Sequence, residues 1–114
     1  MKKYLLRMVL LVLLLMPAAL ATGNVKVNDF SASNTSGNIP LHVYFNGNAT
    51  GDVTNWQWQF KNEETGAITH STANVTTVHT FGKPGVYGVN LTVWGSTGKD
   101  SLSKPRYITV NNSN

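Results

Sequence analysis

Apolar residues recur at every second position in the longest regular pattern of this chain. Tyr87, Val89, Leu91 and Val93 alternate with small or polar residues over residues 85–93. A period of two is typical of a half-buried strand, because successive side chains of a strand point to opposite faces of a sheet. The pattern therefore predicts a strand with one face in a core and the other in water.

A second stretch alternates in the same way and carries the largest side chains of the chain. Trp56, Trp58 and Phe60 share one face, and two glutamines share the other. The two tryptophans could form a sugar-stacking platform, but exposing them would expose the whole aromatic stripe. We expect these three residues in the core, together with Tyr87, Val89, Leu91 and Val93.

Every other apolar pattern after residue 21 also has period two and is broken within ten residues by Gly, Pro, Asn or Asp. The chain is thus predicted to be all-β, with no helix in this part. Short strands separated by such turns are typical of an immunoglobulin-like β-sandwich. We expect about seven strands, at residues 25–30, 41–45, 56–61, 67–71, 75–81, 87–94 and 106–110.

Turn residues lie between the predicted strands. Residues 35–38 form one turn cluster, and residues 62–66 read as a hairpin loop in which Gly66 supplies a positive φ. Tyr87 follows the turn at residues 84–85, which is where a tyrosine corner places its ring in the core and its hydroxyl on nearby backbone.

Residues 1–21 have the pattern of a signal peptide. Lys2, Lys3 and Arg7 precede an apolar run over residues 8–16, and small residues follow at 19–21. A retained membrane anchor is the alternative, but the run is shorter than the roughly 20 residues that span a bilayer. We expect cleavage, one domain over residues 22–110, and a polar tail over residues 111–114.

Charge and cysteine content exclude several functions. Three of the nine basic residues lie in the predicted signal peptide, which leaves six against five acidic residues. Such a balance lacks the clustered Lys and Arg of a nucleic-acid-binding surface. The chain has no cysteine, so thiol nucleophiles, cysteine zinc sites and disulfides are excluded.

The predicted strands resemble those of the PKD (polycystic kidney disease) domain, a β-sandwich of exported and cell-surface proteins. The resemblance covers nearly the whole chain after the predicted signal peptide. It differs where the family commonly has an acidic Gly-Asp-Gly turn, because this chain has a longer polar loop at residues 59–64. The composition is also similar to that of archaeal surface proteins. The matching stretches are FSA at 30–32, PLHVYF at 40–45, WQWQF at 56–60, HTF at 79–81, GVYGVNLTV at 85–93 and YITV at 107–110.

No residue pattern predicts catalysis, a metal site or a cofactor. His42, His70 and His79 fall on different predicted strands, and the resemblance implies that His79 is a packed structural residue that ties a loop to the sheet. The acidic residues are scattered over turns, and no serine lies in a nucleophile elbow. We expect a protein that is not an enzyme and needs no cofactor.

Five Asn-x-Ser/Thr sequons are candidate glycosylation sites if the host modifies exported proteins. The alternative is that these residues are simply the polar residues of a β domain. Asn90 alternates with Val89 and Leu91, so it is expected to point outward in either case. The five sites are Asn34, Asn48, Asn74, Asn90 and Asn111.

Trp94 and Tyr44 occupy outward positions of their predicted strands and are the candidate contact residues. Trp94 follows Val93 near the end of the strongest strand, where the binding loops of sandwich domains gather. The first hypothesis is a secreted or cell-surface module that contacts a protein or envelope component, through loops or by adding a strand to a sheet edge. A carbohydrate-binding accessory domain, with a polysaccharide partner, is the alternative. A secreted inhibitor is a third.

Overall fold

The computed structural model describes residues 24–113, and it folds them into two packed β-sheets without a helix. The predicted signal peptide, residues 1–21, lies outside the described residues. The predicted fold class, an all-β immunoglobulin-like sandwich, is confirmed. The described residues form eight strands: β1 (Lys26–Ala32), β2 (Ser36–Asn38), β3 (Leu41–Thr50), β4 (Val53–Asn62), β5 (Ile68–Ala73), β6 (Thr76–Phe81), β7 (Gly85–Gly95) and β8 (Gly98–Asn111).

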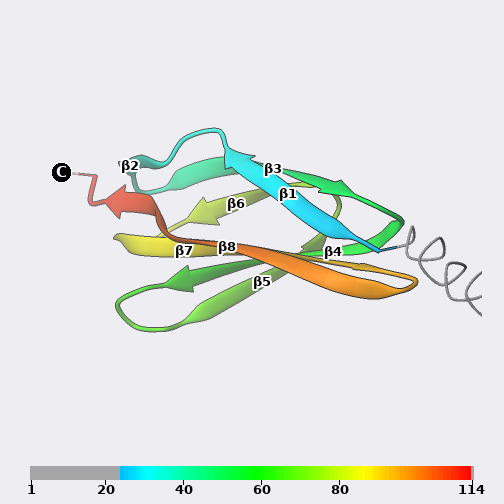
Figure 1. Ribbon diagram of the computed structural model, residues 1–114. Coiled ribbons are helices and arrows are strands. Elements are labelled where there is room, and N and C mark those ends of the chain that lie inside the picture. Colours follow the sequence, from blue (N-terminus) through cyan, green and yellow to red (C-terminus); the bar gives the residue numbers. More distant parts are fainter. Residues whose placement is uncertain (1–23, 114) are drawn as a thin grey trace, which may run out of the picture.

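The strands divide into a three-stranded and a five-stranded sheet. The first has the order β1-β3-β6 and the second the order β2-β8-β7-β4-β5. Neighbouring strands run antiparallel except for β2, which pairs parallel with β8. Figure 1 shows the two layers, with β1, β3 and β6 in one and β4, β5, β7 and β8 in the other.

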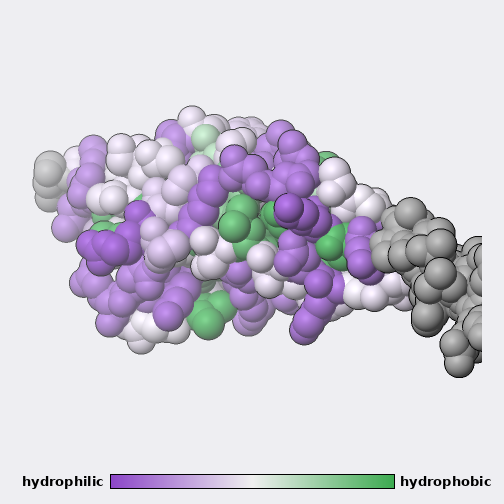
Figure 2. Space-filling view, viewed as in Figure 1, coloured by the Kyte–Doolittle hydropathy of each residue, from purple (hydrophilic) through white to green (hydrophobic). Residues whose placement is uncertain are grey.

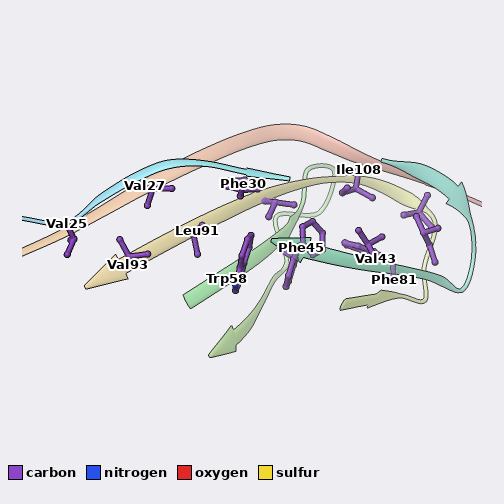
Figure 3. Close-up of a cluster of buried hydrophobic side chains, with 14 residues drawn as sticks. Val25, Val27, Phe30, Val43, Phe45, Trp58, Phe81, Leu91, Val93 and Ile108 are labelled. Carbon is purple, nitrogen blue, oxygen red and sulfur yellow. The ribbon is translucent and has the colours of Figure 1, made fainter. Parts of the chain in front are cut away.

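The core lies between the sheets and is built from the inward side chains of both. Trp58 is fully buried, and its ring meets Phe30 edge-on at a centroid distance of 5.3 Å and Phe45 at 5.6 Å. Figure 3 shows side chains of both sheets meeting along the length of the sandwich. Burying such rings removes large apolar areas from water, which is the main favourable contribution to folding.

The residues that the sequence places in the core differ in how deeply they are buried. Five of them are at most 2% exposed, namely Trp58, Phe60, Val89, Leu91 and Val93. Trp56, His79 and Tyr87 are only half-buried and lie at the margins of the core. The period of two identifies the inward face correctly, but it does not show where along a strand the opposing sheet ends.

Two predicted boundaries are wrong. The turn expected at residues 35–38 contains the short strand β2, which pairs with the end of β8 from Ser36↔Thr109 to Asn38↔Asn111. This pairing draws Asn111 into β8, although the sequence places it in a polar tail. Strand β2 is too short and too polar to show a period, so its pairing with a distant strand could not be inferred locally.

Strand β8 is also much longer than the predicted strand at residues 106–110. Its first half pairs with β7 through the tight turn that joins Gly95 and Gly98. The register then shifts between Tyr87 and Val89 of β7, and Arg106 of β8 adopts a φ of 51°. Across this shift β7 advances by two residues and β8 by four, from Lys104 to Ile108, so the bulge interrupts the regular pairing of the two strands.

Candidate functional site

Two sheet edges lie open on one side of the sandwich. Strand β5 is the last strand of the five-stranded sheet, and β6 is the last strand of the three-stranded sheet. The two edges meet at Ser71 and Thr77, whose hydroxyl oxygens are 3.3 Å apart. An edge strand carries backbone N–H and C=O groups that a further strand can pair with.

Neither edge has the usual protection against such pairing. The sequences are ITHSTA for β5 and TTVHTF for β6, and both lack proline and charged residues. Ile68 of β5 is 50% exposed and Val78 of β6 is 51% exposed. Proteins commonly block open edges with lysine, proline or a bulge, so two unprotected edges side by side are a candidate interaction site.

A pocket of about 360 Å³ opens where the two edges diverge. One wall comes from the hairpin that joins β4 and β5, and the other from β6 and the turn that follows it. We call it the edge pocket. It is lined by Phe60, Asn62, Thr65, Ala67, Thr69, His79, Thr80, Phe81, Gly82, Lys83 and Tyr87.

His79 lies flat against the aromatic floor of the edge pocket. Its ring stacks on Phe60 at a centroid distance of 4.1 Å and an interplanar angle of 13°, and it meets Phe81 edge-on at 4.5 Å. Burial lowers the pKa of His79, because the surroundings penalise the charged imidazolium. The neutral ring is therefore part of the apolar wall near neutral pH.

The expected hydrogen bond from His79 to a loop is absent among residues 24–113. Its aromatic contacts hold the ring instead. The tie between turn and sheet is made by Tyr87, whose hydroxyl donates to the carbonyl oxygen of Lys83 at 2.8 Å. This is the geometry of a tyrosine corner, and it fixes the turn that forms one rim of the edge pocket.

The opposite rim is held by Asn62. Its side-chain oxygen accepts hydrogen bonds from the backbone N–H groups of Glu64 at 2.9 Å and Thr65 at 3.2 Å. Gly66 completes the loop with a φ of 79°, the positive value expected from the sequence. Local hydrogen bonds thus shape both rims, so the pocket is largely formed before any partner arrives.

The two contact residues expected from the sequence do not lie together. Tyr44 is 65% exposed on the outer face of the three-stranded sheet, where it pairs across strands with Val78. Trp94 is only half-buried on β7, in the other sheet, opposite Asn55 and Lys99. Because the two sheets turn their outer faces in opposite directions, these aromatic rings cannot form one platform.

The five sequons differ in how their asparagines are held. Asn48, Asn74 and Asn111 are exposed, and Asn34 is half-buried next to the hydroxyl of Ser33. Asn90 points outward from the central strand β7 and donates from its side-chain nitrogen to Gln59 and Thr92, both at 3.1 Å. Asn74 lies between β5 and β6, beside the edge site.

Within residues 24–113, no three His, Asp or Glu side chains lie close enough together to hold a metal ion. The one ion pair in this part of the chain joins Lys104 to Asp29 at 2.8 Å and is structural, because Lys104 also donates to the carbonyl oxygen of Phe30. The described part of the chain also has no helix that is long and apolar enough to cross a membrane.

The PKD domain family model matches residues 18–110, and the chain therefore belongs to the PKD domain family. The match ends where the predicted domain ends and begins four residues before it. PKD domains are generally non-catalytic modules for protein contact or adhesion, and they typically occur in extracellular or surface proteins. No curated protein sequence matches the chain.

Sequence reasoning did not identify the edge pocket. Its residues come from the β4–β5 hairpin of one sheet and from β6 and the turn after it in the other, and nothing in the sequence shows that β5 and β6 end up side by side in different sheets. The sequence nevertheless carries a signal of an interaction site. The two strands between the 62–66 loop and Gly85 are rich in Thr, and both lack Lys, Arg, Asp and Glu. Such strands are suited to an open edge only if the edge has a partner.

Proposed function

We propose that this chain is an exported, non-catalytic module that contacts a protein partner through the open edges of β5 and β6. An extended segment of the partner pairs with one edge, and one of its apolar side chains enters the edge pocket. In this mode of recognition, backbone hydrogen bonds supply affinity and a side-chain pocket supplies specificity.

The observation that supports this proposal best is the coincidence of unprotected edges with a preformed pocket. The pocket has apolar walls from Phe60, Phe81 and Tyr87, and its volume is large enough for one bulky side chain. Three threonines and Lys83 also line the pocket, and their polar groups can meet the backbone of the incoming strand. Aromatic walls around a buried anchor are typical of the energetic centre of an interface.

The site of action follows from the predicted signal peptide. Cleavage after residue 21 would release the domain outside the membrane, as a secreted or cell-surface protein, and the composition favours an archaeal surface. The rest of the surface is consistent with exposure to water. Figure 2 shows a mostly hydrophilic face in which the hydrophobic residues are scattered in small patches.

A carbohydrate role through Trp94 and Tyr44 has less support. The two residues lie on different sheets, and Trp94 is half-buried. A flat polysaccharide surface could meet only one of them at a time. A secreted inhibitor would need a protruding loop, and the 62–66 loop is instead tied back to its own hairpin.

Protease treatment of the binding surface tests the proposal. The exported protein is incubated with native cell envelopes, with protease-treated envelopes and with insoluble polysaccharides, and the bound fraction is measured. Retention on native envelopes and loss after protease treatment is the expected result. Equal retention on protease-treated envelopes, or binding to no envelope at all, would contradict a protein partner.

A further inference from the structure

A second pocket lies on the outer face of the five-stranded sheet, away from the core. Its volume is about 310 Å³, and we call it the outer-face pocket. It is separate from the edge pocket, because the two share no lining residue. It is lined by Gln59, Lys61, Glu63, Ile68, Gly88, Val89, Asn90, Ser103 and Pro105.

The floor of this pocket is open because β7 has a glycine there. Gly88 pairs with Lys61 in the middle of the sheet. A Cβ atom at Gly88 would lie only 2.5 Å from a carboxylate oxygen of Glu63 and 3.4 Å from the backbone of Pro105. A larger residue would therefore displace the Glu63 carboxylate and occupy the floor, so glycine leaves the hollow open.

The polar groups around the floor are held by hydrogen bonds within the protein. Asn90 donates from its side-chain nitrogen to the side-chain oxygen of Gln59 at 3.1 Å and to the hydroxyl of Thr92 at 3.1 Å. One wall is fixed because Glu63 accepts from the backbone N–H of Arg106 at 3.2 Å. These bonds orient the side chains before a ligand binds, which lowers the entropy cost of binding.

The hydrogen-bonding capacity that remains is a mixture of donors and acceptors. Gln59 keeps its amide N–H₂ group, Asn90 keeps its carbonyl oxygen, and Ser103 can both donate and accept. A donor beside an acceptor matches a hydroxyl group, which does both at once. A phosphate or carboxylate ligand would need donors only, and a metal ion would need acceptors only.

The charge and the apolar walls of the pocket also favour a neutral ligand that carries both apolar and polar groups. The pocket has one cation, Lys61, and one anion, Glu63, so it does not favour a charged ligand of either sign. Ile68, which is 50% exposed, and Pro105 supply apolar surface beside the polar groups. The C–H face of a sugar ring needs such surface, while its hydroxyl groups need the amides.

We propose that the outer-face pocket binds one residue of a neutral carbohydrate, with Gln59 and Asn90 as the residues that read its hydroxyl groups. This inference stands apart from protein binding at the edge pocket, because it uses the other face of β4 and different side chains.

Binding is tested with neutral oligosaccharides built of glucose, galactose, mannose or N-acetylglucosamine. Each is titrated into ¹⁵N-labelled protein expressed from the full 114-residue chain, and the side-chain amide signals of Gln59 and Asn90 are followed by NMR. We expect at least one oligosaccharide to shift both signals. Gln59→Ala and Asn90→Ala should each weaken its affinity by at least about fivefold, since each removes one hydrogen bond.

Gln57→Ala is the matched control, because Gln57 lies on the same strand and face as Gln59 but outside the pocket. The affinity of this variant for the oligosaccharide should stay within about twofold of wild type, a smaller change than the loss of one hydrogen bond causes. Thermal melts verify that every variant is folded. Absence of a shift with all four oligosaccharide types, or equal binding by wild type and both pocket variants, would overturn the proposal.

Discussion

The imidazole ring of His79 lies parallel to the ring of Phe60, with a centroid distance of 4.1 Å. This contact lies at the boundary between the core and the edge pocket, and burial there lowers the pKa of the histidine. The stack therefore couples the stability of the domain to pH. It also keeps the pocket wall uncharged near neutral pH.

Stability should decrease in mild acid because of His79. A histidine with a lowered pKa binds its proton more readily in the unfolded chain, so its stabilising contribution is complete above the ordinary value of 6.5 and is lost as the pH falls through the folded-state pKa. Urea unfolding of wild type at a series of pH values measures this loss.

His79→Phe should remove that part of the pH dependence, because phenylalanine keeps the stack and cannot be protonated. His42→Gln and His70→Gln are controls, since both histidines are exposed. A His79→Phe profile as steep as that of wild type between pH 7 and 5 would show that another group is responsible.

Lys104 should matter more to stability than the carboxylate with which it pairs. It donates to the carbonyl oxygen of Phe30 and lies 4.7 Å from the ring centroid of Phe30 and 4.9 Å from that of Tyr107. We expect Lys104→Met to cost about 1.5–3 kcal/mol, the range for hydrogen bonds to charged groups. Chemical denaturation gives the value.

Asp29→Asn is the comparison for Lys104→Met. The Asp29 side chain is 66% exposed, so water screens its ion pair and we expect the smaller loss of stability for this variant. Lys104 lowers the pKa of Asp29 mainly by its hydrogen bond, so the small contribution should be present above pH 3.8 and be lost in stronger acid. Equal costs for the two variants would contradict the structural role of Lys104.

Tyr87→Phe isolates the hydrogen bond of the tyrosine corner. The variant keeps the ring against Phe81 and loses only the bond to the carbonyl oxygen of Lys83. We expect a cost of about 0.5–1.5 kcal/mol by thermal or chemical unfolding. Tyr87→Ala should cost more, because it also removes the ring. Equal stabilities of wild type and Tyr87→Phe would mean that the hydroxyl makes no net contribution.

Glycans, if the host attaches them, should be found at Asn74 rather than at Asn90. Asn74 is exposed in the connection between two edge strands, whereas Asn90 is half-buried in the middle of a sheet with its side-chain nitrogen already hydrogen-bonded. Mass spectrometry of proteolytic peptides from the exported protein measures each site. A glycan on Asn90 without one on Asn74 would contradict this order and would also fill the outer-face pocket.

The core was readable from the sequence because it depends on local alternation. Leu91 and Val93 repeat with the pleat of one strand, so their inward direction follows from the strand itself. Trp94 was placed correctly on the outer face for the same reason, but its partial burial was not foreseen. That burial depends on neighbours contributed by other strands.

Both pockets depend on pairings between distant strands, which alternation cannot reveal. Ser103 reaches the outer-face pocket only because β8 pairs with β7 opposite Asn90, and Thr69 reaches the edge pocket only because β4 and β5 form a hairpin. The bulge beside Pro105 inserts two extra residues into β8 and so sets which residue of β7 each later residue of β8 pairs with. Register of this kind is a property of the whole sheet.

A charge placed on the open edge tests the central proposal most directly. Thr69→Lys puts an ammonium group on β5 beside the edge pocket, and Thr109→Lys makes the same change at an exposed position of β8, which is paired on both sides. An inward-pointing lysine on an edge strand blocks the addition of a further strand. Binding of each folded variant to native cell envelopes is then compared with wild type.

We expect Thr69→Lys to lose most of the envelope binding and Thr109→Lys to keep it. Undiminished binding by folded Thr69→Lys would show that the partner does not use this edge.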